Sequence, residues 1–310
     1  MEEIILVAGA TGDLGGKITR ELLNNGAKVR AIIRKTSNAK IVAALEKSGA
    51  EVVVLDEWDL PELKAACTNV SCVVSALAGL REVIIDAQKL LLDAAVAAGV
   101  PRFIPSDYSL DFTKFTHGEN RNLDWRREFH THLDAAPIAA TTIFNGAFME
   151  LLTGDMPMIM FKPKLVLYWG DADHKLAFTT MNDTAAYTAQ AAMDSNTPRF
   201  LRIAGDEVSA REIRQLMNQV TGQQFRLIRT GPGSMLGFII KVTRKLAPGE
   251  TELYPAWQGM QYMHNMIDKR ATLLTTDNDR YPAMQWTSVK ALLRAHQEEK
   301  DHDRTNEQES

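Results

Sequence analysis

The sequence predicts an α/β protein built on a doubly wound parallel sheet. Over the first 145 residues, short apolar runs rich in valine and isoleucine alternate with helix-like segments. The runs are almost continuously apolar, which is typical of parallel strands covered by helices on both faces. Strand–helix alternation of this kind implies right-handed crossovers, so we expect one open sheet with helices on each side.

Six strands are expected in this N-terminal part. The helices between them have recognisable ends: an apolar stripe of Leu14, Ile18 and Leu22 stops at Gly26. Asp59 and Glu62 have the spacing of a capping box, and a long helix over Glu82–Ala98 stops before Pro101. The expected strands are Ile4–Ala8, Lys28–Ile33, Glu51–Leu55, Cys72–Ala76, Arg102–Ile104 and Ala140–Phe144.

The pattern becomes less regular after Asn145. We expect a strand pair at 164–169 and 176–178, a helix starting near Asp183, a helix from Ser209 to Val220 and a strand over 225–230. The sequence therefore predicts an N-terminal dinucleotide-binding domain over 1–150 and a smaller α/β substrate-binding region over 151–296, interleaved with the end of the sheet. Residues 297–310 are polar and aperiodic, which predicts a disordered tail.

The composition excludes several classes of function. The formal net charge of -4 gives no bulk footprint for nucleic acid, and no apolar run approaches the roughly 20 residues of a membrane span. The N-terminus enters a strand directly, so we expect no cleaved leader. Cys67 and Cys72 fit neither a disulfide framework nor a familiar metal spacing, and we expect them in the core. The expectation is a cytoplasmic protein with no nucleic-acid partner, no membrane partner and no structural metal.

The segment LVAGATGDLGG contains Gly9, Gly12 and Gly15, directly after the first strand and at the start of a helix. In a dinucleotide-binding elbow the first glycine allows the tight turn, the second admits the pyrophosphate and the third lets helix and sheet pack closely. The helix N-terminus then offers its N–H groups to the phosphates. We expect Thr11, Asp13 and Leu14 to contact the cofactor as well; the alternative is a turn without a ligand.

The end of the second strand indicates which dinucleotide binds. Sites that prefer NAD place an acidic residue about 20 residues after the glycines, on the ribose 2′-hydroxyl. Here that position is Lys35, flanked by Arg34 and Thr36. Such a cationic, donor-rich cluster suits a 2′-phosphate, so the sequence predicts NADP(H). The alternative is a solvated charged loop.

Several longer segments resemble one family. These segments resemble the NmrA-like and isoflavone-reductase-like branch of atypical short-chain dehydrogenases, from about Ile4 to about Leu293: LVAGATGDLGG, VRAIIRKTS, AGVPRFIPSDYSLDF, TTIFNGAFMELL and HKLAFTTMNDTAAYTAQA. The resemblance implies an NADP(H)-binding Rossmann domain with a C-terminal substrate cleft. Relatives divide into NADPH-dependent reductases and non-catalytic dinucleotide sensors that bind regulatory proteins.

The resemblance also implies positions around the nicotinamide. Gln88 matches a family glutamine on the cofactor side, and Ala76 closes the fourth expected strand. Ser106 and Asp107 follow the fifth strand, and Asn145 to Phe148 follow the sixth. All lie at carboxyl ends of strands, where an open α/β sheet builds its site.

The sequence lacks the proton donor most common in short-chain dehydrogenases. That donor is a tyrosine with a lysine four residues later, and none of the six tyrosines has one. The resembled reductases use a lysine on the helix after the fifth strand, and Arg126 stands there, or Arg127 with a one-residue slip. Because arginine stays charged, it polarises an oxyanion but donates a proton poorly.

Two other proton donors are possible. Lys114 could approach from its loop, although a solvated lysine is the alternative, and Tyr108 could lie at the mouth, although packing explains it equally well. We expect no metal site: His130 and His132 do not share a helix face, and Asp171, Asp173 and His174 suit a turn.

Two functions remain open at the level of sequence. The first is an NADPH-dependent reductase of a small apolar electrophile such as a quinone, an enal or an aryl ketone, bound in a cleft lined by methionine and aromatic side chains. The second is an NADP-binding sensor with a regulatory protein partner. The protein is expected to be a monomer or a homodimer.

Overall fold

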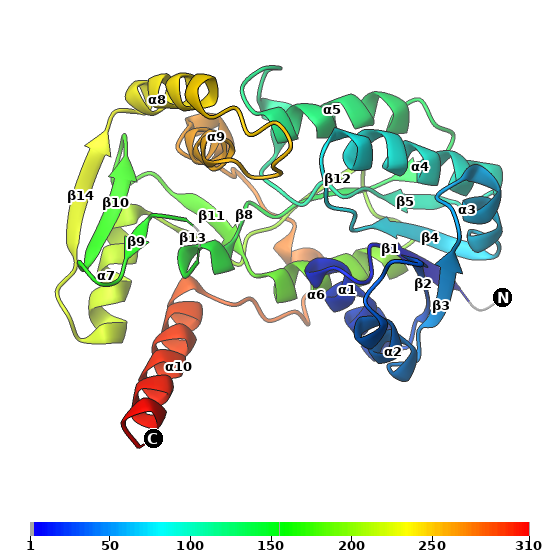
Figure 1. Cartoon of the computed structure of the whole chain (residues 1–310), viewed down its shortest axis with the longest axis horizontal. Helices are drawn as coiled ribbons and strands as arrows, with labels where there is room; N and C mark the ends of the chain where they lie inside the picture. The colour runs from blue at the N-terminus through cyan, green and yellow to red at the C-terminus, as the bar shows by residue number, and fades with distance from the viewer. Residues whose placement is uncertain (1–2, 155, 310) are drawn as a thin grey trace.

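The computed structural model describes residues 3–154 and 156–309 and contains a central parallel sheet (Figure 1). Within these residues the sheet has six strands in the order β3-β2-β1-β4-β5-β6. This is the strand order of doubly wound dinucleotide-binding folds, so the predicted fold class is confirmed. The strands are β1 (Ile4–Ala8), β2 (Lys28–Arg34), β3 (Glu51–Leu55), β4 (Val70–Ser75), β5 (Arg102–Ile104) and β6 (Ala139–Ala140).

Side chains of β1 alternate between two buried clusters, one on each face of the sheet. Ile5 and Val7 pack with residues of α1 (Asp13–Asn24) and α6 (Met181–Met193). Leu6 and Ala8 point the other way. They pack with α3 (Leu60–Ala66), α4 (Gln88–Ala97) and α5 (Arg121–Leu133). The cores on both faces explain why the strand sequences are continuously apolar.

Two further segments complete the N-terminal half. Helix α2 (Ala39–Lys47) begins after an Asn38 side chain that accepts a hydrogen bond from the Lys40 N–H. The long helix expected over Glu82–Ala98 forms, but its first part, Glu82–Ala87, has the wider π-helical winding before α4 continues. Such wide turns are frequent near functional sites.

The sixth expected strand is interrupted. Thr141 donates its N–H to Phe103 of β5, whereas the next residue, Thr142, donates to the Arg199 carbonyl. The chain therefore leaves the main sheet as β6 and continues as β7 (Thr142–Phe144), which pairs in parallel with β12 (Phe200–Arg202). This change of partner carries the chain from the sheet into the C-terminal region.

The two strands predicted at 164–169 and 176–178 do not pair with each other. Both strands form, as β10 (Leu165–Trp169) and β11 (Leu176–Thr179), but they belong to different sheets. β10 pairs with β9 (Ile159–Met160) and β14 (Arg226–Gly231). β11 pairs with β8 (Ala147–Phe148) and β13 (Asp206–Val208). The better partners come from distant parts of the sequence, which local patterns do not reveal.

Helix α7 (Ala210–Thr221) packs on β10 and β14, and two further helices, α8 (Gly233–Leu246) and α9 (Ala256–Met266), pack on each other at the top of the view in Figure 1. Helix α7 starts with a capping box between Ser209 and Glu212, as its sequence suggests. No helix among the described residues is both long and apolar enough to cross a bilayer.

The expectation of disorder after residue 296 is wrong for the described backbone. Helix α10 runs over Val289–Glu309 and projects from the body of the protein (Figure 1). Val289 and Leu293 anchor its start in the core, and Lys300 lies 3.9 Å from the centroid of the Phe161 ring. Glutamate, lysine, glutamine and arginine are good helix formers, so a polar segment can continue a helix that is anchored at its start.

Candidate functional site

The glycine-rich turn after β1 is a close-packed backbone cradle. Gly9 has φ +87°, and a Cβ there would lie 2.6 Å from the Ala76 carbonyl oxygen at the end of β4. A Cβ on Gly15 would lie 2.1 Å from the Gly9 carbonyl oxygen. Only glycine fits either position, because the first glycine needs a left-handed backbone and both approach other backbone atoms.

Helix α1 begins inside this cradle. Gly12 is its N-cap and has no side chain with which to cap the first turn, so the N–H groups of Asp13 and Leu14 face the end of the sheet. Thr11 is half-buried beside them. The Asp13 carboxylate is held 2.8 Å from the Lys17 ammonium. An uncapped helix N-terminus of this kind fits a pyrophosphate.

The cationic cluster lies next to the cradle, at the end of β2. Ile32 is in register with Ala8, the last residue of β1, so Arg34, at the end of β2, lies two residues past the point where the glycine turn begins. Arg34, Lys35 and Thr36 are all exposed. The Lys35 ammonium lies 2.5 Å from the Asp56 carboxylate, and that hydrogen bond raises the pKa of Lys35. Part of the positive charge predicted for a 2′-phosphate is therefore already shared with a carboxylate.

A buried glutamine fixes the loop after β5. The Gln88 Oε1 accepts from the Ser106 N–H at 2.8 Å, and its Nε2 donates to the Ile84 carbonyl at 3.0 Å. The Ser106 hydroxyl donates to the Leu77 carbonyl at 2.7 Å. Both polar ends of Gln88 are thus used within the protein. Gln88 ties the loop after β5 to its own helix, and the Ser106 hydroxyl ties that loop to the loop after β4.

The backbone of Asn145 is hydrogen-bonded, whereas its side-chain amide lacks hydrogen-bond partners among the described residues. Its N–H donates to Ser109, and its carbonyl accepts from the Thr179 hydroxyl at 2.7 Å. Among the residues that the structure describes, neither atom of its buried amide has a hydrogen-bond partner, and the same holds for the Ser75 hydroxyl. Buried polar atoms normally find partners, so these orphaned groups fit a site that is completed by a ligand.

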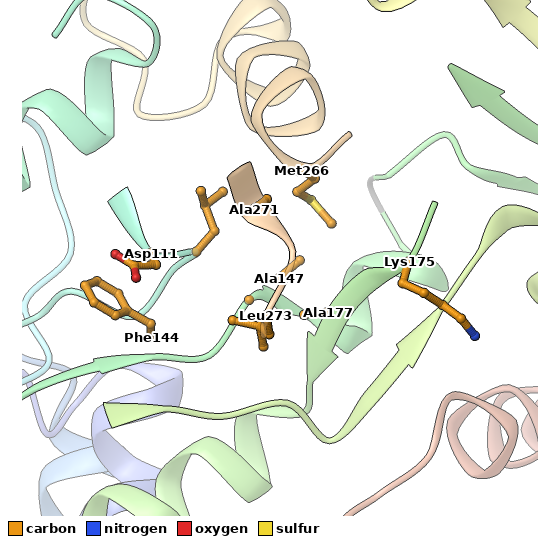
Figure 2. A pocket seen from close by; sticks show the side chains of 10 residues that line it. Asp111, Phe144, Ala147, Lys175, Ala177, Met266, Ala271 and Leu273 are labelled. Carbon is orange, nitrogen blue, oxygen red and sulfur yellow. The ribbon is translucent and has the colours of Figure 1, made fainter. Parts of the chain in front are cut away.

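A small cavity of about 20 Å³ lies beside this point and is lined by Phe144 and Gly146, the chain neighbours of Asn145 (Figure 2). Phe144 and the segment Gly146–Ala147 form one wall, and Leu110 and Asp111 form another. The segment Asp268–Leu274, called the strap below, closes it together with the end of α9. The full lining is Leu110, Asp111, Phe144, Gly146, Ala147, Lys175, Ala177, Met266, Ala271 and Leu273.

This lining differs from the predicted cleft rich in methionine and aromatic side chains. Among the described residues, Met266 is its one methionine and Phe144 its one aromatic residue. Met149 and Met158 instead fill the core beneath, and Met235 and Phe238 lie on the outer face of α8. Small and branched apolar side chains make most of the wall.

The charged groups at the cavity are mostly neutralised. Asp111 is buried, lies 2.8 Å from the Arg202 Nε and accepts from the Thr113 N–H. Lys175 points away from the other labelled side chains in Figure 2 and donates to Glu212 at 2.6 Å. These two groups therefore act as anchors of the wall.

Lys114 is the candidate donor that lies at the strap. Its ammonium donates to the Thr272 carbonyl at 3.2 Å, between Ala271 and Leu273, both of which line the cavity. The strap is held a second time by Arg270, whose guanidinium donates to Glu119 at 2.8 Å. Lys114 is thus placed at the cavity rim by the segment that closes it.

The other two candidates lie in different surroundings. Tyr108 is 8% exposed and belongs to the cluster that contains Ile143 and Tyr187, and burial raises its pKa. Whether Tyr108 packs or donates a proton stays a prediction. Arg126 donates to the Asn122 carbonyl of its own helix at 3.0 Å. Arg127, the alternative position, holds Asp124 at 2.6 Å and the Phe112 carbonyl, so it fixes the loop before α5.

One buried network was missed from the sequence. The His130 Nε2 lies 2.6 Å from the Asp107 Oδ2, which also accepts from the Thr142 hydroxyl. Because Arg199 can only donate to the His130 Nδ1, the Nε2 carries the proton and donates to Asp107. The network ties the β5 loop to α5. No sequence spacing indicates it, since its members come from four separate segments.

The acidic turn before β11 has its own partners. Asp173 binds Arg211 at 2.7 Å, and the His174 Nε2 lies 3.0 Å from the Met266 carbonyl. In the described part of the chain no three histidine, cysteine or acidic side chains are grouped so that they could hold a metal ion.

Comparison with known proteins agrees with this geometry. A model of the NmrA-like family matches residues 1–267. Pinoresinol reductase 1 of Arabidopsis thaliana is 28% identical over 238 residues, which cover 71% of this chain and 75% of that protein. A structure of AtPrR2 with NADP+ and (+)pinoresinol superposes with a TM-score of 0.82 at 22% identity, covering 96% of this chain and 99% of the other.

A second solved structure has a different activity in its name. The NADPH-dependent quinone oxidoreductase QOR2 from Escherichia coli, complexed with NADPH, superposes with a TM-score of 0.72 at 19% identity. The match covers 94% of this chain and 99% of that one. Proteins with the same overall fold therefore carry the names of reductases that act on different molecules.

Proposed function

The chain belongs to the NmrA-like family, and on that premise we propose that it is an NADPH-dependent reductase of a small apolar electrophile such as a quinone, an enal or an aryl ketone. The observation that carries the proposal is the small, mainly apolar cavity lined by the chain neighbours of Asn145 and by Ala271 and Leu273 of the strap, with Lys114 bound to the Thr272 carbonyl between them. Since a cavity of about 20 Å³ holds no more than a water molecule, the strap opens to admit a substrate in this proposal. The reductase names of the relatives support the same reaction class.

The cofactor residues of the proposal follow the carboxyl edge of the sheet. Gly9, Thr11, Gly12, Asp13, Leu14 and Gly15 would hold the pyrophosphate on backbone N–H groups. Arg34, assisted by Lys35 and Thr36, would bind the 2′-phosphate. Ala76, Ser106, Asn145 and Phe148 would border the nicotinamide, with Gln88 positioning Ser106.

Lys114 supplies the acid in this proposal. When bound, NADPH provides a hydride for the electrophilic carbon of the substrate. The Lys114 ammonium would donate a hydrogen bond to the substrate oxygen and then its proton, as negative charge develops there. The apolar wall excludes water, which strengthens this interaction. Tyr108 and Arg126 are not needed for the step.

The sensor function has one specific observation in its favour. Arg126 stands where the resembled reductases have their lysine, and its guanidinium donates to the Asn122 carbonyl of its own helix. A chain that binds NADP(H) without turnover would need no acid at the cavity. Protein partners, a homodimer and a cytoplasmic location stay predictions.

The reductase proposal is tested by NADPH oxidation with a panel of quinones, enals and aryl ketones. We expect turnover with at least one class, and Lys114→Met should lower kcat about 100-fold or more while NADPH binding is unchanged. Lys175→Met is the matched control, since Lys175 lines the same cavity but binds Glu212. Tight NADPH binding with no turnover on the whole panel would support the sensor instead.

A further inference from the structure

Helix α8 has two apolar faces, of which only one is covered. Leu236 and Ile240 are buried on the inner face, and a Cβ on Gly237 would lie 3.4 Å from the His264 ring of α9. The outer face carries Met235, Phe238, Val242 and Leu246, which are 39%, 65%, 40% and 78% exposed. Their spacing of three and four residues places them in one stripe.

This outer stripe is unusual in the molecule. Among the described residues, no other helix has more than one large apolar side chain with comparable exposure. The exposed Tyr254 follows α8 in the next loop. Scattered apolar side chains need no explanation, whereas a contiguous apolar stripe indicates a binding surface.

Contacts with α9 and α5 fix the orientation of helix α8. The Arg244 guanidinium stacks 4.9 Å from the Trp257 ring of α9, and the buried Trp257 is stacked by Arg121 of α5 at 4.8 Å. The Trp257 indole also donates to the Pro248 carbonyl at 2.8 Å. These contacts fix both the end of α8 and the loop after it, so the stripe faces outward.

The charges beside the stripe are of one sign. Lys241 and Lys245 are exposed and lie next to Phe238 and Val242 on the helix surface. The helix sequence GSMLGFIIKVTRKL contains no acidic residue. The protein as a whole has a net charge of -4, so this positive character is local to the helix.

We propose that α8 docks the protein on an anionic lipid surface, with the outer stripe in the headgroup region and Lys241 and Lys245 on lipid phosphates. A short helix with an apolar face and flanking lysines is the form that lies in a membrane interface without spanning the bilayer. The sequence predicted no membrane partner because it contains no apolar run long enough to span a bilayer, and docking at the surface needs no such run. Docking does not depend on the proposed reductase activity.

The test is cosedimentation of the full chain with vesicles. We expect binding to phosphatidylcholine vesicles that contain phosphatidylglycerol, and about tenfold or greater loss in Phe238→Ser/Val242→Ser. Lys241→Gln and Lys245→Gln should each weaken binding to the anionic vesicles about fivefold and leave binding to pure phosphatidylcholine unchanged.

The control replaces exposed apolar residues on two other helices. Ile41 and Leu60 are each 41% exposed on α2 and α3, and Ile41→Ser/Leu60→Ser should bind vesicles like the wild type. NADPH binding reports that each variant is folded. No cosedimentation of the wild type, equal loss in the control, or a wild-type dimer that Phe238→Ser/Val242→Ser dissociates would each overturn the proposal; the dimer would make the stripe an interface between copies.

Discussion

The sequence predicted that Arg34 and Lys35 both bind the 2′-phosphate, and the structure gives the two side chains different surroundings. The ammonium of Lys35 is engaged by Asp56, whereas Arg34 is the exposed last residue of β2, the strand that pairs with β1 before the glycine cradle. A bidentate guanidinium also matches phosphate geometry better than an ammonium does. Recognition of the 2′-phosphate should therefore depend chiefly on Arg34.

Replacing these residues one at a time tests that division. Arg34→Ala should raise the Kd for NADPH about 10- to 150-fold, the equivalent of about 1.5–3 kcal/mol, with little change for NADH. Lys35→Ala should have a smaller effect, because its charge is already shared. Both constants are measured by fluorescence titration. If Arg34→Ala weakens NADPH and NADH equally, the 2′-phosphate assignment fails.

Single-residue roles were the least predictable from sequence. Gln88 was placed on the cofactor side, and in the structure both of its polar ends bind the protein. Tyr108 was a possible acid, and in the structure it packs in a core cluster. Which side of a loop a side chain faces depends on tertiary packing, such as that of Tyr108 in the same cluster as Tyr187 of α6. No local sequence pattern indicates this packing.

At the level of elements, the strap is the feature that joins the two halves of the site. Lys114 and Glu119 come from the segment between β5 and α5, and they hold Thr272 and Arg270 of the strap. The Arg270 guanidinium also lies 4.7 Å from the Phe115 ring. Opening the strap requires breaking these contacts, so their strength should govern access to the cavity.

The Arg270–Glu119 pair makes this opening sensitive to substitution and pH. Its hydrogen bond lowers the pKa of Glu119 from 4.5 to about 2. A lowered pKa means that the ionised carboxylate stabilises the closed strap above pH 4.5, and that this contribution is lost as the pH falls toward 2. Both side chains are partly exposed, so the contribution is about 0.2–1 kcal/mol.

Glu119→Gln should therefore increase hydrogen exchange of the strap up to about fivefold at neutral pH. Asp173→Asn, which breaks the exposed Asp173–Arg211 pair elsewhere, is the control and should leave the strap unchanged. Wild type and Glu119→Gln should converge as the pH falls from 4.5 toward 2. Identical exchange at neutral pH would show that the pair does not hold the strap.

For the molecule as a whole, the elements and the sheet of the N-terminal half were predictable, whereas in the C-terminal half the strands formed as predicted but did not pair as predicted. Each of the first five strands of the main sheet is followed by a helix, so local apolar patterns and cap residues such as Asp59 were sufficient there. In the C-terminal half, β10 finds a partner about 60 residues later in the chain, at Arg226–Gly231. Pairing at that separation is decided by packing, not by local sequence.

The separation of residues along the sequence also explains which parts of the site were predictable. The glycine cradle lies within one strand, one turn and one helix, so its spacing is visible in the sequence. The cavity combines residues from 110 to 273, and the strap that closes it has no periodic pattern. The dinucleotide elbow was therefore evident from the sequence, whereas the position of Lys114 beside Thr272 required the structure.

Hydride transfer to a substrate is most directly measured with NADPH that carries deuterium at the transferable position of the nicotinamide. We predict that deuterium appears on the reduced carbon of an enal or aryl ketone product, or that a quinone is converted to its hydroquinone with oxidation of the deuterated NADPH, and that Lys114→Met slows this reaction without weakening NADPH binding. Tight NADPH binding with no deuterium in any enal or ketone product and no hydroquinone from any quinone of the panel would contradict the reductase proposal.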